Sequence, residues 1–146
     1  MIGHGIGLRP KHFDEVLEAC PDVGLFEATT ESYLVPRSAA SRVLERVRRE
    51  RPVVLHGVSM AIGSIEPPPV EYLAALRGLI DRIEPALVSD HLCWGRSGGK
   101  YAHDLLPLPL TEEAIAHVAQ RIRAVQEALG RQILIENVSS YLTFDG

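Results

Sequence analysis

The sequence has few of the features that mark secreted, membrane or nucleic-acid-binding proteins. It has only two cysteines, Cys20 and Cys93, which form neither a CxxC pair nor a disulfide framework. The amino end lacks the basic and apolar regions of a signal peptide, and no apolar run is long enough for a membrane helix. The net charge is −4, and no dense Lys/Arg tract is interleaved with the few aromatic residues. We therefore expect a cytoplasmic protein with no membrane and no nucleic-acid partner.

Common nucleotide-binding and hydrolase motifs are also missing. The chain has no GxxxxGK[ST] phosphate loop and no GxSxG nucleophile elbow. Its glycine-rich start precedes or forms the first strand and does not link a strand to a helix, so it is a poor dinucleotide fingerprint. The sequence thus argues against P-loop, α/β-hydrolase and dinucleotide-binding functions.

The composition is that of a single globular domain over residues 1–146, with 46% hydrophobic and 23% charged residues. Short apolar runs alternate with longer amphipathic ones. The runs predict strands at residues 5–8, 24–28, 53–56, 87–91 and 133–136. Helices are predicted at residues 12–19, from Ser38 or Ser41 to about 49, from about Pro69 to before Pro85, and from Thr111 to 129. This alternation favours an α/β fold with a parallel sheet, either doubly wound or part of a barrel.

The last predicted helix has the clearest pattern. Thr111 can cap its start, and Gly130 can end it in a left-handed conformation. Its expected core face consists of Ile115, Val118, Ala119, Ile122, Val125 and Leu129. Two segments, residues 57–68 and 93–110, are expected to be long loops at the carboxyl edge of the sheet, where α/β folds place their sites.

Three of the predicted strands end on residues that can bind a metal: His56, His91 and Glu136. Because parallel strands share one carboxyl edge, these side chains should converge. Buried polar groups at successive strand ends are costly without a shared partner, which favours a metal over a structural role. Imidazoles and a carboxylate without a thiolate suit zinc, manganese or iron, and spacing alone does not choose among them.

Four neighbouring residues are candidates for supporting or substrate-binding roles: Asp90, Asn137, Asp104 and Glu31. Asp90 should point to the sheet face opposite His91, and Asn137 has the same ambiguity beside Glu136. Glu31 follows the second strand in a stretch that looks like a turn, where a glutamate is ordinarily solvated. Cys93 is expected to be a buried thiol with no catalytic role.

Several ordered motifs resemble one enzyme family. They are GIGLR (5–9), FEATTESY (26–33), LHGV (55–58), VSDHL (88–92), HDLLPLP (103–109) and IENVSSY (135–141). Together they span nearly the whole chain and resemble the multinuclear non-haem iron enzymes of the MbnB and TglH family, formerly a domain of unknown function.

The resemblance implies a TIM (β/α)8-type barrel, of which this chain covers about the first five strands and four helices. It also implies two or three iron ions, with His56, His91 and Glu136 among their ligands. Such enzymes use molecular oxygen to oxidise a cysteine in a ribosomally made precursor peptide, often with a small partner protein that presents the peptide.

The chain departs from the family pattern in two ways. Ser32 stands where the family usually has an asparagine. Family members also continue after the fifth strand to supply further aspartate, histidine and asparagine ligands. Because five strands do not close an eight-stranded barrel, the outer strands would carry open edges. We therefore expect a fragment of a longer protein, with a homodimer paired edge to edge as the alternative.

Three functions remain open from the sequence. The first is oxidative, iron-dependent peptide modification in natural-product biosynthesis, for which this chain alone holds only part of the metal site. The second is a zinc- or manganese-dependent barrel hydrolase or sugar isomerase that uses the same three ligands. The third is a non-catalytic half-barrel that binds metal weakly or not at all.

Overall fold

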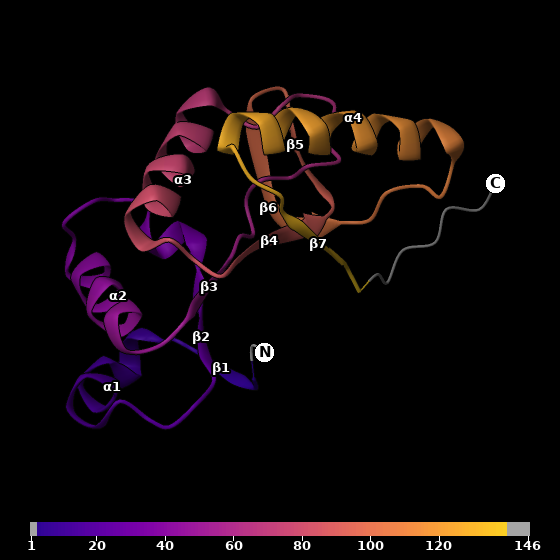
Figure 1. The fold of residues 1–146 in the computed structure, drawn as a ribbon. Coiled ribbons are helices and arrows are strands. Elements are labelled where there is room, and N and C mark those ends of the chain that lie inside the picture. Colours follow the sequence, from indigo (N-terminus) through magenta and orange to yellow (C-terminus); the bar gives the residue numbers. More distant parts are fainter. Residues whose placement is uncertain (1–2, 140–146) are drawn as a thin grey trace.

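A five-stranded parallel sheet forms the centre of the computed structural model, which describes residues 3–139 (Figure 1). Its strands are β1 (Gly5–Gly7), β2 (Leu25–Thr29), β3 (Val53–His56), β4 (Leu87–Leu92) and β7 (Leu134–Asn137). They lie side by side in the order β1-β2-β3-β4-β7, and every neighbouring pair is parallel. The predicted parallel α/β fold is confirmed, with all five predicted strands within two residues of their expected bounds.

Four α-helices connect these strands and lie on one side of the sheet (Figure 1). They are α1 (Phe13–Ala19), α2 (Ala39–Glu50), α3 (Val70–Ile83) and α4 (Glu112–Leu129). Two short 3-10 helices, η1 (Pro10–His12) and η2 (Thr30–Tyr33), precede α1 and follow β2. No helix within residues 3–139 combines the length and apolar character that a membrane crossing needs.

Burial along the strands alternates because successive side chains point to opposite faces. The face toward the helices is buried and apolar; its members include Phe26, Ala28, Val53, Leu55 and Val88. The other face is not covered by any helix of the described residues, and Leu87 and Leu134 are exposed there. The side chains that converge at the carboxyl end of this open face are therefore accessible.

The helix ends follow the predicted capping chemistry. Ser38 Oγ accepts a hydrogen bond from Ser41 N at the start of α2, which decides between the two candidate caps. Thr111 Oγ1 accepts from Ala114 N at the start of α4, and Gly130 ends that helix with φ 64°. Local sequence thus sets where the helices begin and end.

The predicted core face of α4 is wrong at its first turn. Ile115 is 61% exposed, whereas Val125 and Leu129 in the second half of the helix are buried. An 18-residue helix is about 27 Å long, while the four-residue strand β7 spans only about 13 Å. The amino half of α4 therefore extends beyond the layer against which its other half packs.

The predicted loop at residues 93–110 is also wrong in part, because it contains a β-hairpin. Strands β5 (Trp94–Ser97) and β6 (Lys100–Leu106) pair antiparallel as a separate two-stranded sheet. Gly98 and Gly99 join them with φ values of 58° and 73°. Two positive φ values are what a tight hairpin turn requires, and glycine adopts them without steric cost. The hairpin stands beside the carboxyl end of β4.

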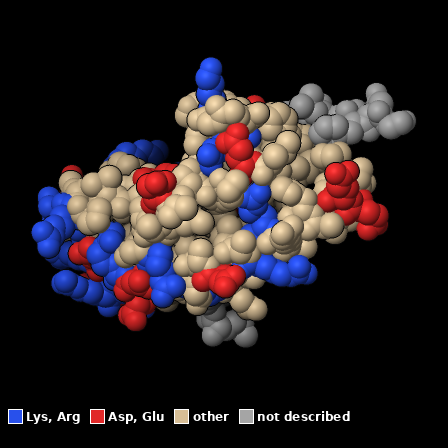
Figure 2. Space-filling view, turned by 90° about the horizontal axis from the view of Figure 1, so that it is seen from above, with Lys and Arg blue, Asp and Glu red and all other residues tan. Residues whose placement is uncertain are grey.

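Basic side chains gather at the end of the molecule that carries α1 and α2, with acidic side chains among them (Figure 2). Several of these arginines hold neighbouring elements together. Arg48 Nε donates to Ile83 O at the end of α3, and Arg46 Nη2 donates to Leu17 O in α1. Part of this basic end therefore has a structural explanation.

Candidate metal centre

His56 ends β3 on the open face of the sheet, and its ring is oriented by a serine on the next strand. His56 pairs in register with Ser89 of β4, and its Nδ1 lies 2.8 Å from Ser89 Oγ. The Ser89 hydroxyl donates to Leu55 O, so it is free to accept from the ring. This arrangement places the proton of a neutral His56 on Nδ1. It leaves Nε2 without a proton and able to bind a metal.

His91 lies on the same face of β4, two residues after Ser89, and its ring is fixed in the same way. Its Nδ1 lies 3.1 Å from Gly57 O, and a carbonyl oxygen can only accept. His91 is buried, and its ring lies edge-on to that of His56 with 4.6 Å between centroids. Both imidazoles thus direct Nε2 away from the backbone, toward a common point.

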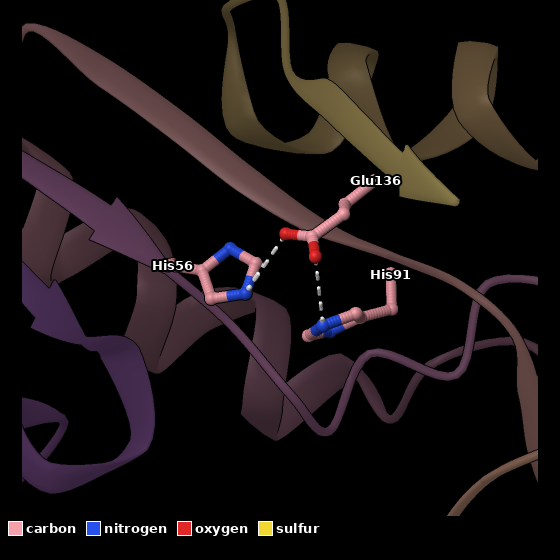
Figure 3. Close-up of side chains that lie close together, drawn as sticks. All are labelled: His56, His91 and Glu136. Carbon is pink, nitrogen blue, oxygen red and sulfur yellow. Dashed lines mark ion pairs between the residues drawn. The ribbon is translucent and has the colours of Figure 1, made fainter. Parts of the chain in front are cut away.

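Glu136 of β7 supplies a carboxylate at that point (Figure 3). It pairs in register with His91, and its Oε1 lies 3.9 Å from His91 Nε2 while its Oε2 lies 3.5 Å from His56 Nε2. One ligand atom from each residue lies within 4.8 Å of the others. Ligand atoms around a tetrahedral ion bound at 2.0–2.1 Å are about 3.4 Å apart. Small side-chain movements would therefore fit the three residues to one ion.

The electrostatic setting also suits a cation. Glu136 is 58% exposed, so the centre opens to solvent from the side of the edge strand. No Lys or Arg pairs with this carboxylate among the described residues, where its ion-pair partners are the two histidines. The charge of Glu136 is thus available to a metal.

Asp90 lies between these residues in sequence but outside the cluster in space. It is completely buried, and its carboxylate accepts from His91 N at 2.7 Å and from Met60 N at 3.4 Å. Burial raises its pKa to about 7, and the two backbone donors oppose that shift. Asp90 therefore ties β4 to the loop after β3. Asn137, the neighbour of Glu136 on β7, is exposed.

The expectation that Glu31 is a solvated turn residue is wrong. Its Oε1 accepts from Val58 N at 3.1 Å, Ser59 N at 2.9 Å and Tyr72 Oη at 2.9 Å. The reason is η2, which continues directly from β2 and carries Glu31 toward the loop that follows His56. Glu31 thus fixes the loop whose Gly57 carbonyl orients His91, and it does not belong to the ligand cluster.

The remaining candidates lie in or beside the hairpin. Asp104 is exposed on β6 and is not one of the three residues of the cluster, and its Oδ1 accepts from Leu105 N. Cys93 is buried just before β5, and burial raises the pKa of its thiol to about 12. A thiol with so high a pKa stays protonated at neutral pH.

Sequence reasoning missed Ser89 and Gly57, the two residues that orient the histidines. A signal for Ser89 was present, because residues two apart on a strand share a face and Ser89 stands two before His91. Gly57 acts through its backbone carbonyl, which any residue type has. Only the fold shows that this carbonyl meets an imidazole.

Replacing Ser89 with alanine is expected to weaken metal binding by about 10–100-fold, the usual effect of losing a hydrogen bond behind a ligand. The His56 ring would lose the acceptor that fixes its orientation and proton position. Competition with a chromogenic chelator would measure the affinity. Ser97→Ala, at an exposed serine in the hairpin, is the matched control. An unchanged affinity in Ser89→Ala would show that the hydrogen bond does not matter.

Comparisons with known proteins place this chain in a family. A model of the RiPP precursor modification enzymes MbnB/TglH/ChrH matches residues 3–146. The last motif of the sequence extends to Ser140 and Tyr141, which lie outside the residues that the structure describes. The match therefore covers nearly all of the chain, including the three strand ends that form the cluster.

Similar curated proteins carry only a family label. A UPF0276 protein of Anaeromyxobacter sp. (strain Fw109-5) is 59% identical over 144 residues, which are 99% of this chain and 51% of that protein. A UPF0276 protein of Caulobacter vibrioides (strain NA1000 / CB15N) is 46% identical over 97% of this chain and 51% of its own length. The chain thus spans about half the length of the curated relatives it matches. It belongs to the MbnB/TglH/ChrH family of RiPP precursor modification enzymes.

Proposed function

We propose that this protein forms part of an iron- and oxygen-dependent enzyme that oxidises a cysteine in a ribosomally made peptide. The observation that carries the proposal is the cluster of His56, His91 and Glu136, in which both free Nε2 atoms face one carboxylate. Two histidines and one carboxylate are the ligand set of many non-haem iron oxygenases. Membership in a peptide-modifying family supplies the class of substrate.

The complete enzyme is proposed to be a TIM-type barrel with two or three iron ions. Support comes from the strand order, which follows the sequence without reversal, and from the helices, which lie on one side of the sheet. A doubly wound sheet would reverse its order and carry helices on both faces. Additional strands, from a longer chain or from a second copy, would close the barrel and bring the remaining ligands.

The residues of this chain have distinct roles in the proposed reaction. Bound iron would supply the redox chemistry by which the cysteine is oxidised and molecular oxygen is reduced. His56 and His91 present Nε2 in fixed orientations because Ser89 and Gly57 hold their Nδ1 atoms. Glu136 contributes negative charge and would hold the metal together with the two histidines. Glu31 and Asp90 hold the loop after β3 and so maintain the Gly57 acceptor.

The test is to measure the metal that the protein retains after anaerobic purification from iron-supplemented cells. We expect at least one iron per chain by elemental mass spectrometry, and near-complete loss in His56→Ala. His12→Ala, at an exposed histidine outside the cluster, should retain the metal. Zinc or manganese without iron, together with no oxygen uptake in the presence of a cysteine peptide, would contradict the proposal. That result would favour a hydrolase or isomerase.

The peptide and any partner protein belong to the same proposal. A cysteine peptide should alter the visible absorption of the ferric protein through its thiolate, whereas the matched serine peptide should not. A small protein that presents the precursor would raise the peptide affinity without changing this spectral difference. A spectrum that is the same with both peptides would count against thiolate binding.

A further inference from the structure

A pocket of about 190 Å³ opens between the loop after β3 and the β5–β6 hairpin. Its lining includes Val58 and Ser59 from the loop, Cys93 at the end of β4, and Tyr101, His103 and Asp104 from β6. The volume is far more than one water molecule needs and below the 300–1,000 Å³ of pockets for drug-sized ligands. The pocket therefore has room for one side chain and not for a large cofactor.

Two residues that line the pocket lie close in sequence to the two histidines of the metal cluster. Cys93 follows His91 by two residues and Ser59 follows His56 by three. An extended chain advances at most about 3.6 Å per residue, so the Cα atoms of these pairs lie within about 7 Å and about 11 Å. A peptide held by its cysteine at the cluster advances by about 3.3 Å per residue. Its next one or two residues would reach this pocket.

Hydrogen bonds fix both walls of the pocket. On the loop side, Glu31 accepts from Val58 N and Ser59 N. On the hairpin side, Ser64 Oγ accepts from Gly95 N and from Arg96 N. Gly63 N also donates to Cys93 O. The pocket is thus held in shape by hydrogen bonds on either side.

An irregularity in the hairpin brings polar groups to the pocket. Trp94 pairs with Leu106 and Arg96 with Tyr101, so one residue of β5 faces four of β6. Within this bulge His103 has φ 55°, a left-handed conformation that is costly for a residue other than glycine. A Cβ at Gly95 would lie 2.8 Å from Asp104 O, so the bulged strand passes close over β5. Bulges re-aim side chains in this way beside functional sites.

We propose that this pocket binds the residue adjacent to the modified cysteine in the peptide substrate, and that it limits the size of the side chain at that position. This inference rests on the proposed function. Ser59, Tyr101, His103 and Asp104 offer hydrogen-bond donors and acceptors to the pocket. A peptide backbone offers one donor and one acceptor per residue, and these can pair with the polar side chains of the pocket.

The inference can be tested on the unsubstituted, iron-loaded protein with synthetic peptides under anaerobic conditions. The reference probe is the acetylated and amidated peptide Gly-Ala-Cys-Ala-Gly. Each alanine of the probe is replaced with tryptophan in turn. One of the two replacements should weaken binding about ten-fold, because overpacking a formed site typically costs about 1–3 kcal/mol and about 1.4 kcal/mol is a ten-fold change in affinity. Equal affinity for all three peptides would overturn the inference.

A protein variant tests the same pocket from the other side. Val58 is 41% exposed at the rim, so Val58→Phe should fill the pocket without disturbing the core. We expect about ten-fold weaker binding of the reference peptide and an unchanged iron content. Val70→Phe, at an exposed valine that opens α3, should change neither value. If Val58→Phe does not fold, Ser59→Leu takes its place.

The outcomes separate this inference from the proposed function. Loss of iron binding, or equal binding of the cysteine probe and its serine counterpart, would contradict the proposed function. Iron retention and cysteine-dependent binding that Val58→Phe leaves unchanged would overturn the pocket alone. Absence of measurable binding by every probe would also overturn the inference that the pocket binds the peptide.

Discussion

Replacing Glu136 with alanine is expected to lower iron affinity by more than 100-fold, beyond the about 10–100-fold loss typical of residues that only support a ligand. The substitution removes the one carboxylate that faces both Nε2 atoms and leaves two neutral imidazoles. Iron content and chelator competition would measure the effect. Glu127→Ala, at an exposed glutamate of α4, should leave the affinity unchanged.

The same measurement on Asp90→Ala tests the assignment of roles. Asp90 contacts His91 N and Met60 N but no atom of the cluster centre, so its loss should reduce bound iron less than the loss of Glu136 does. Asp90→Asn keeps the shape of the side chain if the alanine variant does not fold. Equal losses in Glu136→Ala and the Asp90 variants, or a larger loss in the latter, would contradict the ligand assignment.

Gly57→Ala is expected to destabilise the protein by about 3 kcal/mol, at the upper end of typical overpacking costs. A Cβ at this position would collide with Asp90 Oδ2, which belongs to a buried carboxylate that two backbone groups hold in place. Either Asp90 or the Gly57 carbonyl must move, and that carbonyl is the acceptor for His91 Nδ1. We therefore expect weaker iron binding together with the lower stability.

Urea denaturation of the metal-free protein would measure the loss of stability. Gly78→Ala is the matched control, because a Cβ at this position in α3 would have no atom within 4 Å apart from its chain neighbours and the backbone of its own helix. Alanine there should stabilise the helix by up to about 1 kcal/mol. If both variants shifted the free energy of unfolding in the same direction, the close approach of Asp90 to Gly57 would not be a constraint.

The sequence predicted the ligand cluster because the positions of its three residues depend only on local sequence pattern and on the pairing of parallel strands. Apolar runs marked β3, β4 and β7, and parallel strands bring their carboxyl ends together. Register then places Glu136 beside His91. The polar residue that ends each run was enough to identify the candidates.

The misses arose where tertiary contacts decide. Glu31 looks solvated from its neighbours, and only the path of η2 brings it to Val58, Ser59 and Tyr72. Ile115 is exposed because the layer beneath α4 is shorter than the helix. Helical periodicity carries no information about the length of that layer. The hairpin after β4 is different, because the Gly98-Gly99 pair between two runs is a recognised turn signal. The sequence therefore contains a signal for this hairpin, and the expectation of a loop at residues 93–110 does not use it.

The strand order bears on how a cell avoids loading the wrong metal. His56 and His91 lie on paired strands, whereas Glu136 follows 45 residues after His91. Ribosomes add about 5–20 residues per second, so the imidazole pair is synthesised about 2–9 s before the carboxylate. During that interval a nascent chain offers nitrogen ligands alone, which copper and zinc bind more tightly than ferrous iron does. In the proposed iron enzyme, completion of β7 would therefore be the step at which the site first gains a hard oxygen ligand that suits iron.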